Sequence, residues 1–291
     1  MMVNDVFSDE GMEACLGQVV DLMIGQLGST NLGFLFEENR GLLSTGKMLR
    51  SRLAYRIGLR NGIEPTTLTH ASAAVEMIHS ASLLHDDVID GGMIRRGAPS
   101  FWVARGIPGA ILLGDMLLFK ALDLICQVET GRLTHPLVLF TGELCEAESE
   151  QELILQGAES RLEYCTRIAR RKTGALFAFI GLACAGTDPD KQKVLTEVGY
   201  RLGTAYQMAD DVLDATGNAE EVGKTLGTDL DRNIVSAAKM SEHDAIDVIE
   251  RLCVDALESV RPWPEIYEGV NEYLEKDLRP ALSKLLAYAV R

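Results

Sequence analysis

The amino-acid sequence predicts an all-α protein. Helix-forming residues dominate, and apolar residues recur at spacings of three and four positions, which is the period of one helix face. Alternating apolar and polar residues between turns, the pattern of strands, are absent. Only 8 prolines interrupt the 291 residues, and no linker or low-complexity segment divides them. We therefore expect a single all-α domain over residues 1–291.

The first long helix is expected to begin near Pro65, because proline is favoured in the first helical turn. The segment that follows, HASAAVEMIHSASLLHDDVID, keeps the helical spacing of apolar residues until Gly91 and Gly92. Two consecutive glycines end a helix readily. The sequence thus predicts a helix of about 25 residues that finishes in acidic sequence.

A second long helix is expected to begin where Asp188 can cap its N-terminus and Pro189 can occupy the first turn. It carries GYRLGTAYQMADDVLD and ends before Gly217. Both long helices therefore end in the same kind of acidic sequence. Four further stretches have helical spacing, at residues 109–128, 161–186, 243–260 and 267–290.

Charge and composition exclude several classes of protein. A formal net charge of -15 argues against a general nucleic-acid binder, because affinity for phosphate backbones depends on dense Lys and Arg. The longest apolar run, at residues 175–186, is too short to span a bilayer. Six cysteines form no CxxC pair, and the N-terminus lacks the basic and apolar regions of a secretory signal. We therefore expect a soluble protein of the reduced cytoplasm.

A DDxxD pattern lies in the last turns of both predicted long helices. Negative charge at a helix C-terminus opposes the helix dipole, so these carboxylates need a neutralising partner. The first and last aspartates of each pattern are four residues apart and share one helix face. The six residues are Asp86, Asp87 and Asp90 in the first helix, and Asp210, Asp211 and Asp214 in the second.

Carboxylate oxygens suit a hard cation such as Mg²⁺, which commonly binds one or two carboxylates together with substrate phosphates. A solvated helix end is the alternative for a single DDxxD. Two copies at corresponding places, each preceded by apolar sequence, favour a metal site at a cavity wall.

A phosphorylated substrate would also need cations, despite the acidic total charge. Short basic clusters supply them, several beside glycines that permit close approach of a ligand. They are Lys47, Arg50 and Arg52 in TGKMLRSR, Arg95 and Arg96 in MIRRGAP, Arg171 and Lys172 in RRKTG, and Lys224 in EEVGKTLGTDL. For an isolated cluster a solvated surface is the simpler reading, but Arg95 and Arg96 follow the first aspartates through a tight glycine-rich turn.

Together these motifs resemble the trans-isoprenyl diphosphate synthases, a family of all-α prenyltransferases, over almost the whole chain. The family's first aspartate motif, DDxxDxxxxRRGxP, is met by residues 86–99, and its second, DDxxD followed by GKxxGxDL, by residues 210–214 and 223–230. GKxxR at 46–50, EMIHSASLLHDD, Gly114-Asp115, KTG at 172–174 and Tyr206-Gln207 follow in the family's order. The resemblance implies an isoprenoid synthase bundle with a central catalytic cavity.

The resemblance also implies a reaction: the Mg²⁺-dependent head-to-tail condensation of isopentenyl diphosphate with an allylic diphosphate. More than one Mg²⁺ ion per active site and a homodimer are implied with it. Metal ions and basic side chains would stabilise the departing pyrophosphate, and a dry cavity would protect the allylic cation from water.

Site roles follow from the resemblance, residue by residue. Asp86, Asp90 and Asp210 would ligate Mg²⁺, with Asp87, Asp211 and Asp214 as further or outer ligands. Arg95, Lys172 and Lys224 would grip the allylic diphosphate. Lys47, Arg50, His79 and Arg96 would hold isopentenyl diphosphate. Thr173 and Gln207 would supply oxygen dipoles near the carbocation.

Two positions depart from the family pattern. Ile234 stands where the family has a lysine that helps to bind the allylic diphosphate, and Ser51 stands where a proline commonly follows GKxxR. Arg232 lies two residues from Ile234, although arginine and lysine are not interchangeable at phosphates.

Product length in the family depends on residues about one turn before the first aspartates. Ala81 and Ser82 are small there, which favours a product of C25 or longer and a farnesyl or geranylgeranyl diphosphate primer. Ile78, one turn deeper, and side chains between Leu112 and Phe119 are candidates to close the cavity floor.

Two other functions would share part of this sequence pattern. A non-catalytic partner subunit of a heteromeric prenyl synthase would share the fold, but it is expected to lose aspartates that this chain keeps. A class I terpene cyclase would share metal-triggered ionisation, but it does not need Lys47, Arg50 and His79.

Overall fold

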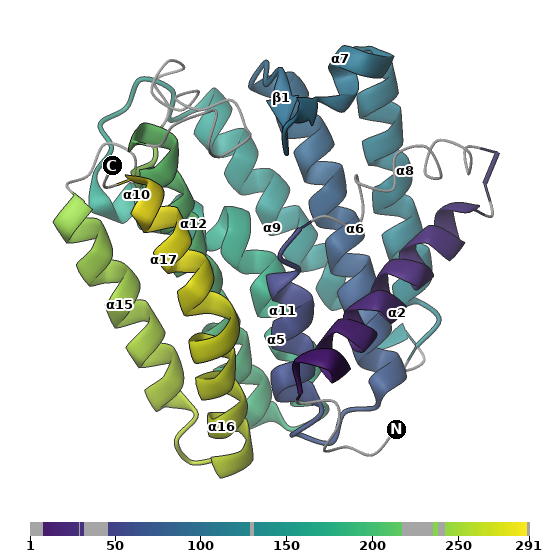
Figure 1. Ribbon diagram of the computed structural model, residues 1–291, viewed down its shortest axis with the longest axis vertical. Coiled ribbons are helices and arrows are strands. Elements are labelled where there is room, and N and C mark those ends of the chain that lie inside the picture. Colours follow the sequence, from purple (N-terminus) through teal and green to yellow (C-terminus); the bar gives the residue numbers. More distant parts are fainter. Residues whose placement is uncertain are drawn as a thin grey trace.

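Two long helices, α6 (Pro65–Ile89) and α12 (Pro189–Thr216), run through the centre of the bundle (Figure 1). The computed structural model describes residues 8–28, 30–31, 46–128, 131–216, 235–237 and 242–289. Pro65 lies in the first turn of α6, as predicted. Asp188 caps α12 as predicted, because its Oδ1 accepts the backbone N–H groups of Asp190 at 3.0 Å and Lys191 at 3.1 Å. The all-α prediction is confirmed.

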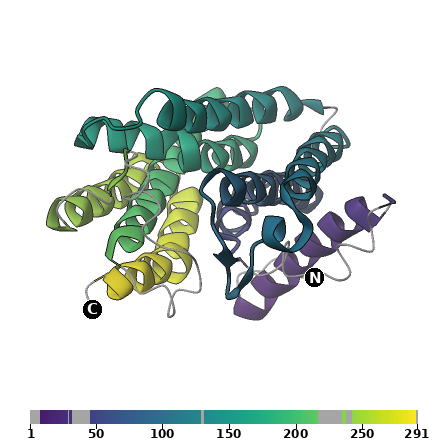
Figure 2. The same cartoon turned by 90° about the horizontal axis from the view of Figure 1, so that it is seen from above.

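The remaining helices surround these two. Their bounds are α2 (Asp9–Gly28), α5 (Leu49–Gly58), α7 (Phe101–Arg105), α8 (Ile107–Ile125), α9 (Thr134–Leu153), α10 (Leu162–Ala169), α11 (Ala175–Ala185), α15 (Glu242–Ser259), α16 (Pro264–Tyr273) and α17 (Arg279–Ala289). Viewed from above, α2 and the C-terminal helices lie on opposite sides of the bundle (Figure 2). Apolar spacing did not predict α2, α5, α7 or α9.

Two stretches predicted as continuous helices contain π-helical turns. The stretch 161–186 is divided into α10 and α11 by the turn η2 (Arg170–Gly174), and 267–290 is divided by η4 (Leu274–Leu278). A π-helical turn fits one extra residue into a helix and is frequent at functional sites. Apolar spacing does not reveal such a turn, because the helix continues on both sides of it.

Helix α11 is the most deeply buried element, with ten of its eleven residues inside the core. The backbones of α11 and α12 pack very close together. A Cβ atom at Gly181 would lie 2.0 Å from the carbonyl oxygen of Leu195, and one at Gly199 would lie 2.2 Å from that of Phe177. Only glycine permits this backbone contact, which fixes η2, directly before α11, beside α12.

A small hairpin follows α6, formed by β1 (Ile94–Arg95) and β2 (Ala98–Pro99). The antiparallel register pairs Arg95 with Ala98, so Arg96 and Gly97 form the turn. Both have positive φ, 54° for Arg96 and 75° for Gly97, as a two-residue hairpin turn of this hand requires. The tight turn expected after the first aspartates is confirmed, and its strands are the only ones in the described part of the chain.

The C-terminal ends of α6 and α12 point toward the same end of the bundle, the one that carries the hairpin (Figure 1). Both aspartate motifs are therefore brought to one place. Across the described ranges, none of the helices has the length and low polarity needed to cross a bilayer.

Candidate active site

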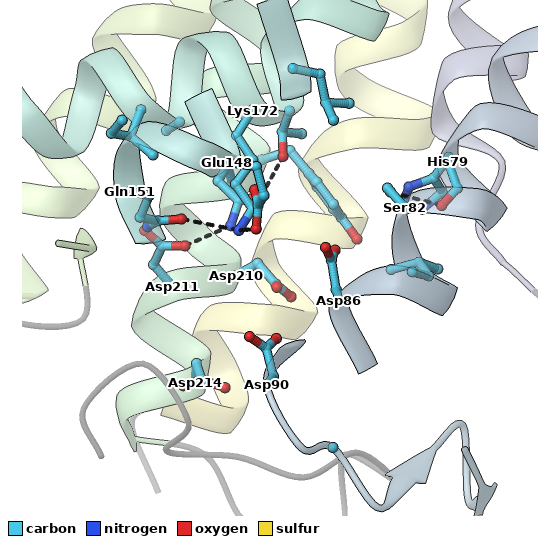
Figure 3. Close-up of a pocket in the computed structure, with 18 of the residues that line it drawn as sticks. His79, Ser82, Asp86, Asp90, Glu148, Gln151, Lys172, Asp210, Asp211 and Asp214 are labelled. Atoms are coloured by element: carbon cyan, nitrogen blue, oxygen red, sulfur yellow. Dashed lines mark hydrogen bonds and ion pairs between the residues drawn. The ribbon is translucent and has the colours of Figure 1, made fainter. Parts of the chain in front are cut away.

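A cavity of about 310 Å³ lies between the last turns of α6 and α12, with α9, η2 and the hairpin completing its wall (Figure 3). Most of the site residues predicted from the sequence line it. They are Arg50, His79, Ser82, Asp86, Asp87, Asp90, Arg95, Arg96, Lys172, Thr173, Gln207, Asp210, Asp211 and Asp214. The two aspartate motifs, more than a hundred residues apart in the chain, thus face one space.

The three aspartates of α6 have different surroundings. Asp87 is buried, and the guanidinium of Arg95 binds it closely: Nε lies 2.8 Å from Oδ1 and 2.9 Å from Oδ2, and Nη2 lies 2.7 Å from Oδ1. Asp86 and Asp90 instead face the cavity (Figure 3). Asp87 therefore holds the hairpin, and the other two carboxylates are directed into the cavity.

Asp86 lies in a strongly acidic environment. Its pKa is raised to about 7, mainly by burial and further by the negative charges of Glu148 and Asp90, while Lys172 acts in the opposite direction. A carboxylate crowded in this way is stabilised in its ionised form by a cation.

The second motif has the same division of roles. Asp210 faces Asp86 and Asp90 across the cavity (Figure 3). Asp211 is buried and accepts two hydrogen bonds, from Nε2 of Gln207 at 2.6 Å and from the backbone N–H of Ala237 at 2.9 Å. Asp214, one turn further, is also buried at the cavity wall.

The donor set fits a hard divalent cation. Within the described ranges, no three His, Cys, Asp or Glu side chains are already arranged around one point. Asp86, Asp90 and Asp210 offer carboxylate oxygens from opposite sides of the cavity, and Mg²⁺ commonly takes its other ligands from water and substrate phosphates. Asp87 and Asp211, whose oxygens already accept hydrogen bonds from the protein, are less available.

The π-helical turn η2 presents Lys172 and Thr173 to the cavity. Lys172 Nζ lies 2.7 Å from Oε1 of Glu148 and 3.1 Å from Oε1 of Gln151. Thr173 donates a hydrogen bond to Oε1 of Gln207. Lys172 thus contacts α9 and the next residue, Thr173, contacts α12; these two helices lie on either side of η2.

Sequence reasoning missed Glu148 and Gln151 of α9, which line the cavity beside Lys172. They are three residues apart and share one helix face. The available signal was the polar run EAESEQE at 146–152, where this pair had nothing to distinguish it from solvated residues.

A second, smaller pocket of about 60 Å³ carries the opposite charge. Lys47, Arg50, His79 and Arg96 line it, with Glu76 as the acidic residue among the described lining. Burial lowers the pKa of His79 well below its usual value, and the positive charges of Arg50 and Arg96 lower it further. The imidazole is therefore neutral at pH 7.

Arg50 is the central cation of this second pocket. It is only 7% exposed, its guanidinium lies 4.9 Å from the centroid of the Phe177 ring, and its Nε has no hydrogen-bond partner among the described residues. Burial lowers its pKa, while Glu76 acts in the opposite direction. A buried cation of this kind favours an anionic ligand.

Left-handed backbone flanks the same pocket. Met48 (φ 47°) and Arg96 (φ 54°) are the two non-glycine residues with positive φ in the described part of the chain. This conformation costs about 1–2 kcal/mol for a residue with a side chain, and such residues cluster at ligand sites. A Cβ atom at Gly46 would lie 3.2 Å from Nη2 of Arg96, so the hairpin and the segment before α5 meet closely here.

Other predicted residues lie elsewhere. Ala81 and Ile78 are buried in the core, whereas their neighbour Ser82 lines the cavity. Arg52 pairs with Glu13 and Asp277. The basic residue Arg171 pairs with Glu146 at 2.9 Å and Glu150 at 2.7 Å. Of the candidates Leu112 to Phe119, the two end residues are exposed, at 68% and 73%. Lys224, Arg232, Ile234 and the GKxxGxDL motif lie outside the described residues.

Comparison with known proteins connects this geometry to a family. A family model described as polyprenyl synthetase matches residues 34–247. The octaprenyl diphosphate synthase of Haemophilus influenzae is 34% identical over 188 residues, which cover 64% of this chain and 57% of that protein. The short chain isoprenyl diphosphate synthase of Methanothermobacter thermautotrophicus is 32% identical over 244 residues, covering 78% and 75%. The chain thus spans little more than half the length of the first of these relatives.

Among solved structures, a polyprenyl synthase from Caulobacter crescentus has the same fold. It superposes with a TM-score of 0.70 at 25% identity, over 96% of this chain and 94% of the other. That structure contains calcium and isoprenyl diphosphate.

Proposed function

The chain belongs to the polyprenyl synthetase family, and from this premise we propose that it condenses isopentenyl diphosphate with an allylic diphosphate to give an all-trans polyprenyl diphosphate. One observation supports this most strongly: the acidic cavity and the basic pocket share part of their walls. Arg50, His79, Arg96 and Tyr206 line both. Two anionic substrates would therefore lie side by side, one held through metal ions and the other by basic side chains.

In the acidic cavity, Asp86, Asp90 and Asp210 would hold Mg²⁺, more than one ion being proposed. When bound, the metal supplies charge stabilisation for the departing pyrophosphate. The calcium and isoprenyl diphosphate in the Caulobacter crescentus structure support a divalent cation together with a diphosphate at this kind of site. Lys172 lines the same cavity as Asp86 and would contact the same diphosphate.

In the basic pocket, Arg50, Lys47 and Arg96 would bind the isopentenyl diphosphate. Neutral His79 can donate one hydrogen bond without adding charge. Holding the two substrates next to each other makes the condensation effectively intramolecular. Arg95, bound to Asp87, would sit at the boundary between the two diphosphates and position the hairpin turn that carries Arg96.

We propose a product of C25 or longer, made from a farnesyl or geranylgeranyl diphosphate primer. Ser82 supports it, because the cavity wall has a small side chain there. The relatives do not decide the length, since one is named for an octaprenyl product and another for a short chain.

The proposed assembly is a homodimer. Helices α8 and α9 contact each other and expose large apolar side chains: Leu112 at 68%, Phe119 at 73% and Leu139 at 58%. Exposed apolar residues of this size mark interaction surfaces when they gather. The proposed location is the cytoplasm, which agrees with six free cysteines.

The test of the function is a product assay. Purified protein is incubated with Mg²⁺, labelled isopentenyl diphosphate and, separately, dimethylallyl, geranyl, farnesyl and geranylgeranyl diphosphates, and the dephosphorylated products are sized by chromatography. Products of C25 or longer from the farnesyl or geranylgeranyl primers are expected. No product with any primer would contradict an autonomous enzyme and support a subunit that needs a partner.

Ser82→Phe sharpens the assay, because a bulky ring at the cavity wall should shorten the product. The matched control is Ser80→Ala, which changes a buried serine on the same helix that lines only the smaller pocket. If Ser82→Phe leaves the product length unchanged, the proposed role of this wall is wrong, although the enzymatic function stands.

A further inference from the structure

Two glutamine side chains connect η2 to the described segment at residues 235–237. Gln151 of α9 accepts a hydrogen bond from Lys172 Nζ through Oε1, at 3.1 Å, and donates one from Nε2 to the carbonyl oxygen of Val235, at 2.7 Å. The ammonium of Lys172 is thereby linked to Val235 through a single amide.

The second glutamine makes the corresponding connection on the other side. Gln207 of α12 accepts a hydrogen bond from Thr173 through Oε1 and donates one from Nε2 to Oδ1 of Asp211, at 2.6 Å. The other carboxylate oxygen of Asp211 accepts the backbone N–H of Ala237, at 2.9 Å.

These five hydrogen bonds close a ring. Lys172 and Thr173 are consecutive, and Val235 is two residues from Ala237, so the chain itself supplies the two remaining links. We call this ring the glutamine circuit: Gln151, Lys172, Thr173, Gln207, Asp211 and the segment 235–237. The positions of Lys172, Gln151 and Asp211 can be followed in Figure 3.

The orientation of each amide is fixed by chemistry. Lys172 can only donate and the carbonyl of Val235 can only accept, so Gln151 must present Oε1 to the first and Nε2 to the second. The carboxylate of Asp211 receives two donors, so Gln207 must present Nε2 to it and Oε1 to Thr173. Reversing Gln151 would break two hydrogen bonds, and reversing Gln207 would break the one to Asp211.

The part of the circuit that holds residues 235–237 is also buried. Gln151 is 4% exposed and Asp211 is 7% exposed, while Val235 and Ala237 are almost completely enclosed. A buried polar group without its partner is costly, and a fully satisfied network is rigid. The orientation of each side chain in the circuit therefore restricts the orientation of its hydrogen-bond partners.

We propose that Gln151 and Asp211 are positioning residues, which couple the orientation of Lys172 and Thr173 to the docking of residues 235–237 against α9 and α12. The proposal rests on the proposed function, because it assumes that Lys172 and Thr173 act on the allylic substrate. It gives Asp211 a purpose other than metal binding, since both its oxygens already accept hydrogen bonds from the protein.

Gln151→Glu tests the proposal, because it keeps the shape of the side chain and the acceptor for Lys172 while it replaces the donor nitrogen by a carboxylate oxygen. The carboxylate still accepts from Lys172, but it sets an oxygen against the carbonyl of Val235. Amide hydrogen exchange at Ala237 is measured in the metal-free protein and should become about tenfold faster, the effect of losing about one hydrogen bond that closes the structure. Exchange at the wild-type rate would overturn the proposal.

Glu148→Gln is the matched control. Glu148 is the other acceptor of Lys172 on the same helix, but its hydrogen bond to Lys172 is not one of the five that close the ring. Exchange at Ala237 should stay within about twofold of the wild type in this variant. An increase equal to that of Gln151→Glu would show that the segment responds to any change near Lys172, which contradicts a specific link.

Asp211→Asn gives a second, independent approach. An amide cannot accept from both Gln207 and Ala237, so exchange at Ala237 should again rise about tenfold. In the variant that combines it with Gln151→Glu, the increase should fall short of the product of the two single effects, because both residues anchor one segment. Fully multiplicative effects would mean that the two anchors are independent and would overturn the coupling.

Steady-state kinetics separate this role from a merely structural one. Gln151→Glu should lower kcat about tenfold while the KM for isopentenyl diphosphate stays near the wild-type value, since the basic pocket is not part of the circuit. An equal rise of KM would contradict a positioning role. The exchange measurement does not depend on turnover, so a failure of the proposed function would leave the test of the circuit intact.

Discussion

The two aspartate motifs share one five-residue pattern and one position at the end of a long helix, yet their middle aspartates have different partners. Asp87 is bound by the guanidinium of Arg95. Asp211 is bound by a neutral amide and a backbone N–H. In both motifs the first aspartate faces the cavity (Figure 3). One residue along a helix rotates the side chain by about 100°, so the second carboxylate of each pair is turned toward a neighbouring element.

The comparison teaches that the repeated pattern contains two kinds of acid. The aspartate at the first position of each motif faces the cavity. The aspartate at the second position binds a segment that follows the helix in the chain. In the first motif that segment is the hairpin with Arg95 and Arg96, and in the second it is residues 235–237.

The largest expected effect distinguishes first from second positions. Asp86→Asn or Asp210→Asn should lower kcat/KM by about 10²–10³-fold, because each removes a charged oxygen ligand of the proposed metal site. Asp211→Asn should lower it only about tenfold, since it loses one hydrogen bond of a positioning network. Initial rates at saturating Mg²⁺ measure the difference. Equal losses at positions 210 and 211 would remove the distinction on which the comparison rests.

A smaller effect is expected on stability, where replacing Asp87 should lower the free energy of unfolding more than replacing Asp211. Asp87→Asn should reduce the free energy of unfolding by about 2 kcal/mol, because it leaves the partly buried guanidinium of Arg95 without its charged partner. Asp211→Asn should cost about 1 kcal/mol, since its partners are neutral. Urea denaturation of the metal-free proteins measures both values.

The control for this prediction is a double-mutant cycle with Arg95→Gln. The coupling energy between Asp87 and Arg95 should account for most of the loss at Asp87. A coupling energy near zero, or a larger loss at Asp211 than at Asp87, would mean that the nature of the partner does not set the stability.

Much of the fold was predictable from the sequence. The long helices α6 and α12 were expected with nearly their observed bounds, because Pro65, Asp188 and Pro189 at their starts and glycines at their ends act locally. Helices α2, α5, α7 and α9 were not predicted. The weak apolar face of α9 explains its case, since only four of its 20 residues are buried.

The site was predictable as a list of residues but not as a set of contacts between them. Fifteen residues predicted from the sequence line the two pockets, fourteen of them in the larger cavity and Lys47 in the smaller pocket. The resemblance separated Asp86, Asp90 and Asp210 from Asp87 and Asp211, but it did not predict that Asp87 binds Arg95 or that Asp211 binds Gln207 and Ala237. Gln151 could not be found at all, because its importance depends on contacts with Lys172 and Val235, which lie 21 and 84 residues away.

The smallest expected effect concerns pH, and it tests whether the leading carboxylate of the first motif is truly crowded. The pKa of Asp86 is raised to about 7 in the folded protein from an ordinary value of 3.8, chiefly by burial and then by Glu148 and Asp90. The folded state therefore binds the proton more tightly than the unfolded state. The free energy of unfolding should fall as the pH rises from about 4 to about 7.

Asp86→Asn removes this titration and provides the measurement. In metal-free buffer at pH 8 the variant should be more stable than the wild type by about 1 kcal/mol, and the difference should disappear near pH 4. Saturating Mg²⁺ at pH 8 should then stabilise the wild type more than the variant, because binding to the folded state raises its stability. A difference that is constant between pH 4 and pH 8 would show that Asp86 is not crowded. The leading carboxylates of the two motifs would then differ less in their surroundings than the charges near Asp86 indicate.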